Sequence, residues 1–274
     1  MYFEPAWHHG LECRDGGLRE NNPVGVAVNE AKTIWGQNVA FDVIVSLGCG
    51  EAKNPQSQPR QVFMVPGWLT HLFQTLLRTM NGNSAWEKFS SSVNNELLDR
   101  CSRLTVRFQQ TREPDLDDVN AIAEMEQLAT SYRFHYQQPK GNFFPVWGQP
   151  SDELEALAHR LMGSLFFFEL KSIKQHEEVS IVKGWICCRL PPGTECHRRL
   201  IKRTSHFLVT NQKVHVPTLR DDERLWLEVS FHQQDSLDSE PLRIDVNFDC
   251  AYAVSISGFP MTLEVGLLPL ICMP

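Results

Sequence analysis

Residues 15–36, with the sequence DGGLRENNPVGVAVNEAKTIWG, decide the fold that the chain is expected to adopt. The opening Asp15-Gly16-Gly17 is typical of a tight turn, because aspartate bonds its own backbone and glycine accepts positive φ. A helix is predicted over 24–35, since Asn22 can cap it, Pro23 suits its first position and a glycine follows it. The stretch therefore predicts a turn that leads into a helix.

The residues after this helix continue the alternation of strands and helices. Residues 41–47 are apolar after Asp42, which predicts a strand covered on both faces in a parallel sheet, and Gly48-Cys49-Gly50 ends it. This order of elements predicts an α/β fold for residues 1–136. Further elements predicted there are helices over 68–80, 85–98 and 117–132, and a strand over 104–108.

Residues 137–150 contain three prolines and two glycines, which predicts a linker between a first domain, 1–136, and a second domain, 151–274. The second domain begins with a predicted helix over 153–162. It continues with strand-like runs in which apolar residues alternate, so a mainly antiparallel β domain is expected. These strands are predicted at 180–190, 225–231, 244–248, 252–257 and 262–267.

Composition narrows the classes of function. The 26 basic and 33 acidic side chains give a net charge of −7, so nucleic acid is not an expected partner. The longest apolar runs, such as 43–47 and 165–168, are far shorter than the ~20 residues of a membrane-spanning helix. The first residues show no secretory leader. We therefore expect a cytoplasmic protein without a transmembrane segment, which meets a membrane only at its surface.

Eight cysteines occur without the spacing of a zinc site, so they are expected to be reduced and mostly buried, and no metal is expected. Cys187 and Cys188 are neighbours on a predicted strand, where side chains alternate, which indicates one buried and one exposed thiol. His8 and His9 could serve a metal or act as a base, but no partner has ligand spacing. A solvated loop is the favoured interpretation there.

Two segments could contact lipid. Residues 68–80 could enter a lipid interface, although their low charge favours a packed helix. The second segment is a cationic cluster that could meet anionic headgroups, although a solvated turn or helix face is the favoured interpretation. This cluster consists of Arg198, Arg199, Lys202 and Arg203, with His197 beside them.

Several short motifs between residues 2 and 50 occur in a specific order. In this order the chain closely resembles the patatin-like phospholipase family, especially its fungal multidomain members. A weaker resemblance extends to about residue 132. Cys49 stands where the family commonly has threonine. The motifs are Asp15-Gly16-Gly17-Leu18, Asn21-Asn22-Pro23, Asn29-Glu30-Ala31, Ile34-Trp35 and Ser46-Leu47-Gly48-Cys49-Gly50.

The resemblance implies a role for Asp15. In the family, the aspartate of an Asp-Gly-Gly or Asp-Gly-Ala motif pairs with a serine in a catalytic dyad that uses no metal or organic cofactor. A serine hydroxyl is a weak nucleophile until a base accepts its proton, and a carboxylate can do so directly. Asp15 is therefore the expected general base. Gly16 and Gly17 would let the loop turn close to the nucleophile, and a phospholipid or another acyl-lipid ester is the expected substrate.

The sequence contains neither a Gly-x-Ser-x-Gly turn nor a glycine-rich oxyanion segment. Ser84 follows Gly82 but precedes Trp86, and Ser46 precedes Gly48 but follows Ile44. Both elements come before the aspartate in the family. The chain is therefore expected to be the C-terminal part of a patatin-like domain, nearly inactive by itself. The alternative is a non-catalytic lipid-binding or protein-binding module built on the β-rich second domain.

Overall fold

A computed structural model describes residues 6–13, 20–52, 82–108, 118–132, 153–176, 179–220, 223–234, 241–248 and 253–261. Contacts within the chain divide it into two compact units. Unit 1 consists of Met1–Val39 and Val45–Phe134, and unit 2 consists of Ala40–Ile44 and His135–Pro274. The predicted linker over 137–150 lies outside the described residues, so the domain boundary stays a prediction.

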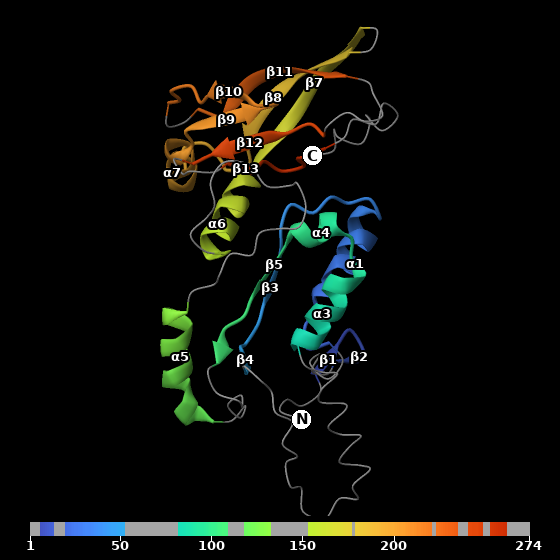
Figure 1. The fold of residues 1–274 in the computed structure, drawn as a ribbon, viewed down its shortest axis with the longest axis vertical. Helices are drawn as coiled ribbons and strands as arrows, with labels where there is room; N and C mark the ends of the chain where they lie inside the picture. Colours follow the sequence, from blue (N-terminus) through green and yellow to red (C-terminus); the bar gives the residue numbers. More distant parts are fainter. Residues whose placement is uncertain are drawn as a thin grey trace, which may run out of the picture. The chain divides into compact units, whose positions relative to one another are not determined.

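The helix predicted over 24–35 is confirmed as α1, Val24–Trp35. Its buried residues, Val24, Val28 and Ala31, follow a helical spacing and form one apolar stripe. The helix ends at Trp35, and the following Gly36 has a φ of 99°, which suits a residue without a side chain. α1 contacts the next described helix of unit 1, α3 (Figure 1).

The prediction of one helix over 85–98 is wrong, because two helices occupy this region. They are α3, Gly82–Ser92, and α4, Asn95–Asp99. Asn94 separates them: its backbone is extended and its side chain accepts a hydrogen bond from the amide of Leu97, at 2.9 Å. An asparagine in this position starts a new helix. Farther on, the predicted helix over 117–132 is present as η2, Val119–Ala121, followed by α5, Ile122–Ser131.

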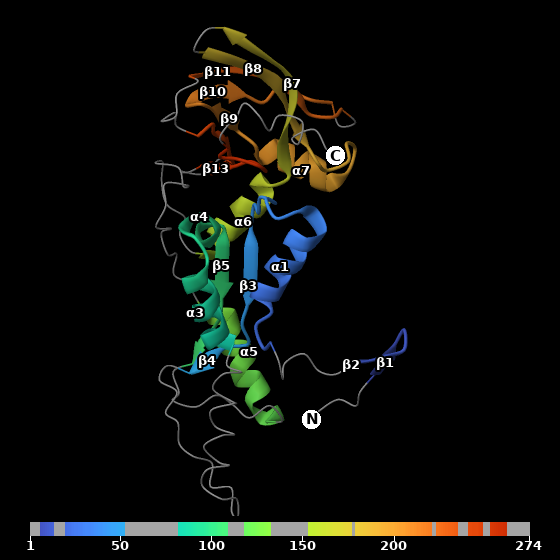
Figure 2. The ribbon, with the colours of Figure 1, turned by 90° about the vertical axis from the view of Figure 1, so that its right-hand side faces the viewer.

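Four short strands of unit 1 form two separate pairs. β3, Ile44–Leu47, is hydrogen-bonded to β5, Cys101–Leu104, and Figure 2 shows them side by side. β4, Glu51–Ala52, pairs in parallel with β6, Arg107–Phe108. Between the pairs, the amide of Gly48 donates to the carbonyl of Leu104 at 2.8 Å. The predicted strand over 104–108 is thus divided between β5 and β6.

β3 departs from its prediction in length and in burial. It begins at Ile44, and it is not covered on both faces by the residues that the structure describes. Ser46 is buried, whereas the flanking Val45 and Leu47 are 38% and 73% exposed. The predicted burial is therefore wrong for the described part of the chain, because Val45 and Leu47 share the face opposite to Ser46 and both are exposed there. A separate antiparallel hairpin precedes α1, formed by β1, Ala6–His8, and β2, Leu11–Cys13.

Unit 2 confirms the predicted antiparallel β domain. After helix α6, Glu153–Gly163, a three-stranded antiparallel sheet has the order β11-β8-β7. Its strands are β7, Phe166–His176, β8, Val179–Cys188, and β11, Trp226–Gln234. Gly184 of β8 lies against the carbonyl of Glu169 and the ring of Phe168, where a Cβ would not fit. A glycine is therefore required at this close approach.

A four-stranded antiparallel sheet has the order β10-β9-β12-β13. Figure 1 shows it beside the three-stranded sheet within unit 2. Side chains from both sheets form one apolar cluster, in which Phe166 and Phe207 meet edge to face at 5.2 Å. The cluster joins the two sheets into one domain. The four strands are β9, His206–Val209, β10, Gln212–His215, β12, Ile244–Asn247, and β13, Ala253–Ser255.

The prediction that Cys187 or Cys188 is exposed is wrong, because both are buried. Cys188 faces the apolar cluster, whereas Cys187 is on the opposite face of β8. In the sheet register, Cys187 lies between Phe167 and Trp226, and these large neighbours cover it. The other expectation, that most cysteines are buried, is also wrong for the described residues: the free cysteines Cys13, Cys49 and Cys196 are exposed.

No helix in the described part of the chain combines the length and the apolar character needed to cross a membrane.

Candidate functional site

Asp15, Gly16 and Gly17, the predicted site residues, lie outside the described residues. The structure describes the chain up to Cys13, at the end of β2, and again from Glu20 onward. The site is therefore built from Asn22, the first buried residue after the Asp-Gly-Gly motif in the described part of the chain.

Asn22 joins three elements of unit 1 through its side-chain amide. Its Oδ1 accepts hydrogen bonds from the amide of Val24, at 3.3 Å, and from the hydroxyl of Ser46, at 3.1 Å. Its Nδ2 donates to the carbonyl of Gly82, at 3.1 Å. The start of α1 is thereby fixed to β3 and to the first residue of α3. A buried amide with three partners stabilises such a junction.

Arg103 of β5 continues the chain of hydrogen bonds from Ser46. Its Nη1 donates to the Ser46 hydroxyl at 2.8 Å, and its Nη2 donates to Oδ1 of Asn83 at 3.1 Å. Asn83 donates in turn to Glu51, whose other carboxylate oxygen accepts from Nε of Arg107 at 2.7 Å. These six residues, from Asn22 to Arg107, are called the Asn22–Arg107 network below.

The Arg103 guanidinium is the charged centre of this network. Burial lowers its pKa, and the nearby Glu51 and Cys49 oppose that shift. A guanidinium nevertheless stays protonated in proteins. Its Nε is buried without a hydrogen-bond partner among the described residues. The end of β3 therefore lies beside a fixed positive charge that has Glu51 nearby and one N–H group without an acceptor among the described residues.

Two glycines of the Ser-Leu-Gly-Cys-Gly segment are required by this packing. A Cβ on Gly48 would lie 2.5 Å from Oγ1 of Thr105 and 2.8 Å from Nη2 of Arg103. Gly50 has a φ of 113°, and a Cβ there would lie 2.5 Å from the ring of Phe108. The segment can approach β5 and β6 only because these positions lack side chains.

The network is suited to positioning and not to nucleophilic catalysis. Ser46 donates its proton to the amide oxygen of Asn22, which is not a base, and accepts from the Arg103 guanidinium. A serine becomes a nucleophile only beside a group that can take its proton. The role of this arrangement is therefore structural, since it fixes Asn22 and the start of α1 to β3 and α3.

Other candidates from the sequence are not brought together. His8 and His9 have ring centroids 4.3 Å apart at the end of β1. The described residues contain no group of three His, Cys, Asp or Glu side chains that could hold a metal ion. The cationic cluster lies in unit 2 on a helix, α7, Glu195–Arg203. There, His197 is buried and the cluster's other members are exposed.

Sequence reasoning missed four members of the network: Glu51, Asn83, Arg103 and Arg107. They are single polar residues in separate elements, and Arg103 is 57 positions from Ser46. No short motif links them. The one available signal was Arg103 itself, a charged residue directly before the predicted strand over 104–108, since such a side chain needs partners when it is partly buried.

Comparison of the chain with protein-family models, with curated proteins and with solved structures finds no match. The resemblance to patatin-like phospholipases therefore rests on the sequence motifs alone.

Proposed function

We propose that unit 1 carries the aspartate of a patatin-like Ser-Asp dyad and that the protein belongs to lipid acyl-ester hydrolysis. Asp15 is the general base, and the substrate is a glycerophospholipid or a related acyl ester. The observation that carries the proposal is the Asn22–Arg107 network, which fixes Asn22, seven positions after Asp15, to Ser46 of β3.

A general base must be held within a fraction of an ångström of its working position, which requires a rigid support. Hydrogen bonds to a charged group contribute about 1.5–3 kcal/mol each. Arg103 makes two of them, one to Ser46 and one to Asn83. Through Ser46, these bonds support the position of Asn22, the buried residue nearest in sequence to Asp15 in the described part of the chain.

The proposed nucleophile is a serine in a Gly-x-Ser-x-Gly turn, supplied by a longer form of this chain or by a partner. Exposed apolar side chains of unit 1 are consistent with a further segment that packs on this unit. Ile34, Trp35 and Leu47 are each at least two-thirds exposed in the described part of the chain. A further segment that packs against these side chains would remove their apolar surface from water.

In the proposed reaction, the serine oxygen attacks the ester carbonyl while Asp15 accepts the hydroxyl proton. The C–O bond to the leaving alcohol breaks, and the alcohol takes the proton from Asp15. An acyl-serine remains. Water then attacks the acyl group, Asp15 accepts its proton and passes it to the serine oxygen as the fatty acid leaves. The reaction requires no metal or organic cofactor.

The test is ester turnover by the chain alone and by the chain extended with the residues encoded directly upstream. The chain alone should turn over neither p-nitrophenyl butyrate nor phosphatidylcholine. The extended protein should hydrolyse both, and Asp15→Ala should lower its kcat by about 10³-fold or more. Glu20→Gln, which also removes one carboxylate near the motif, is the matched control and should retain activity. Turnover that survives Asp15→Ala, or Asp15-dependent turnover by the chain alone, would overturn the proposal.

The second candidate is a non-catalytic binding module built on unit 2. This candidate is favoured because the residues of the apolar cluster all belong to unit 2, so that unit has a core of its own. This unit has the packing of a domain that can act by itself. Lipid binding by the chain, together with an extended protein that hydrolyses no ester, would favour this candidate over the hydrolase.

A further inference from the structure

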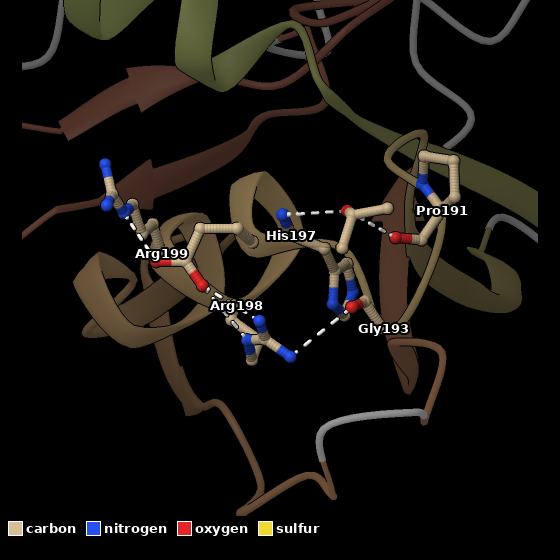
Figure 3. A network of polar contacts seen from close by, with 7 residues as sticks. Pro191, Gly193, His197, Arg198 and Arg199 are labelled. Carbon is tan, nitrogen blue, oxygen red and sulfur yellow. Dashed lines mark hydrogen bonds and ion pairs between the residues drawn. The ribbon is translucent and has the colours of Figure 1, made fainter.

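Helix α7 of unit 2 begins with a well-formed cap (Figure 3). Oγ1 of Thr194 accepts a hydrogen bond from the amide of His197, at 3.2 Å, and donates to the carbonyl of Pro191, at 2.8 Å. On the inner side, His197 and Leu200 are buried, and Ile201 packs against the apolar cluster. The orientation of the helix is therefore fixed, and its opposite side faces solvent.

The solvent side of α7 carries the basic face, defined as Arg198, Arg199, Lys202 and Arg203, all exposed. Glu195 contacts Nη2 of Arg198 at 2.9 Å and Nε of Arg199 at 2.7 Å (Figure 3). In the described part of the chain, Lys202 and Arg203 have no ion-pair partner. The face therefore keeps an excess of positive charge.

This local excess contrasts with the net charge of −7 of the whole chain. Its field extends only about 10 Å at moderate ionic strength, so a partner must bring negative charge into direct contact. A helix of this length presents a convex edge of about 13 Å. Such an edge can lie on a planar anionic surface, whereas the acidic remainder of the chain opposes the longer contact that nucleic acid would require.

The inner side of the helix limits the kind of contact. Leu200 and Ile201 already pack against the core of unit 2, so α7 has no apolar stripe left to insert between acyl chains. Contact with lipid would therefore be electrostatic and sensitive to salt. Arginine suits this role, because its planar guanidinium can donate two hydrogen bonds to one phosphate.

We propose that the basic face of α7 docks on the surface of a membrane that contains anionic phospholipids. This inference rests on the proposed function only for its choice of lipid as the partner. Docking would raise the concentration of the protein at the surface where acyl-lipid esters lie, and it uses residues of unit 2 alone.

Binding of the full chain to vesicles of phosphatidylcholine, with and without phosphatidylserine, tests the proposal by sedimentation. The chain should bind only the vesicles that contain phosphatidylserine, and added salt should release it. Lys202→Gln/Arg203→Gln should weaken binding by about 30-fold, since each basic residue at an anionic surface contributes about a five-fold factor. Glu195→Gln removes the negative charge that lies beside Arg198 and Arg199, and it should strengthen binding by about five-fold.

The matched control is Lys174→Gln/Lys183→Gln, which removes the same charge from exposed positions on β7 and β8. This control should bind like the original chain. Equal weakening in both double variants would overturn the assignment to α7, and so would binding to an RNA oligonucleotide in place of vesicles. Because p-nitrophenyl butyrate is soluble, its hydrolysis by the extended protein tests the proposed function independently. Neither α7 variant should change that activity.

Discussion

Units 1 and 2 differ in what holds them together. In unit 2, two antiparallel sheets close over a shared apolar core, and Phe166 is fully buried there. The described part of unit 1 instead relies on a polar network centred on Arg103, while Ile34 and Leu47 remain exposed. The difference indicates that unit 2 specifies its own fold, whereas unit 1 has surface that another segment is expected to cover.

The largest expected effect comes from the core of unit 2. Phe166→Ala should lower the free energy of unfolding of unit 2 by about 3–5 kcal/mol, because it leaves a cavity beside Phe207 and Phe248. Urea denaturation followed by tryptophan fluorescence measures this. Ile34→Ala on α1 is the control in unit 1, where the side chain is 67% exposed, and it should cost less than about 0.5 kcal/mol. Equal losses in both variants would contradict the comparison of the units.

Elements could be predicted where residues close together in the sequence determine the structure. α1 was predicted correctly because Pro23 and Gly36 mark its ends and because its apolar residues recur at helical spacing. The hairpin between β9 and β10 was missed, since its turn uses Thr210 and Asn211 at positive φ in place of the usual asparagine-glycine pair. The burial of Cys187 also could not be predicted, because it depends on which residues of β7 and β11 lie opposite it.

The candidate site could be predicted only in part, because it also depends on contacts between residues far apart in the sequence. The motif that contains Asn22 was recognised from sequence, and so was the glycine-rich end of β3. The hydrogen bonds from Arg103 to Ser46 and Asn83 required the pairing of β5 with β3, which no local pattern encodes. Asp15 itself lies outside the described residues, and its role stays a prediction.

The second prediction tests the network of unit 1. Arg103→Met should destabilise unit 1 by roughly 2–3 kcal/mol, because it removes the hydrogen bonds to Ser46 and Asn83. Hydrogen exchange at the amides of Val24 and Gly48 measures the loss. Arg107→Met removes a more exposed ion pair with Glu51 and should cost less than about 1 kcal/mol. If both variants exchange equally fast, Arg103 is not the centre of the network.

The third prediction concerns pH. Burial, with the nearby Glu169, raises the pKa of Cys187 from 9.0 to about 11. The folded state thus binds this proton more tightly than the unfolded state, and the resulting stability is complete below pH 9.0 and lost as the pH rises through about 11. The difference in unfolding free energy between the original chain and Cys187→Ala should therefore shrink by roughly 2 kcal/mol across this range. If the unfolding free energies of the two proteins change with pH in parallel, the Cys187 thiol is not protected from solvent in the folded state.

The smallest expected effect is a gain. His197 is buried on α7, its Nε2 has no hydrogen-bond partner among the described residues, and burial lowers its pKa. His197→Leu should raise the stability of unit 2 by about 1 kcal/mol. The gain should increase as the pH falls below 6.5, where the unfolded histidine takes up a proton that the folded one resists. His232→Leu, at an exposed position on β11, is the control and should change stability little. A loss of stability in His197→Leu would contradict this account of the helix.

The most direct test of the central claim is the rate at which a fluorophosphonate labels the serine of the extended protein. Mass spectrometry identifies the labelled residue, which should lie in a Gly-x-Ser-x-Gly turn. Asp15→Asn should slow this labelling by about 10³-fold or more, because the hydroxyl loses its base, whereas Glu20→Gln should leave the rate unchanged. A labelling rate that does not depend on Asp15 would contradict the claim that this carboxylate activates a serine.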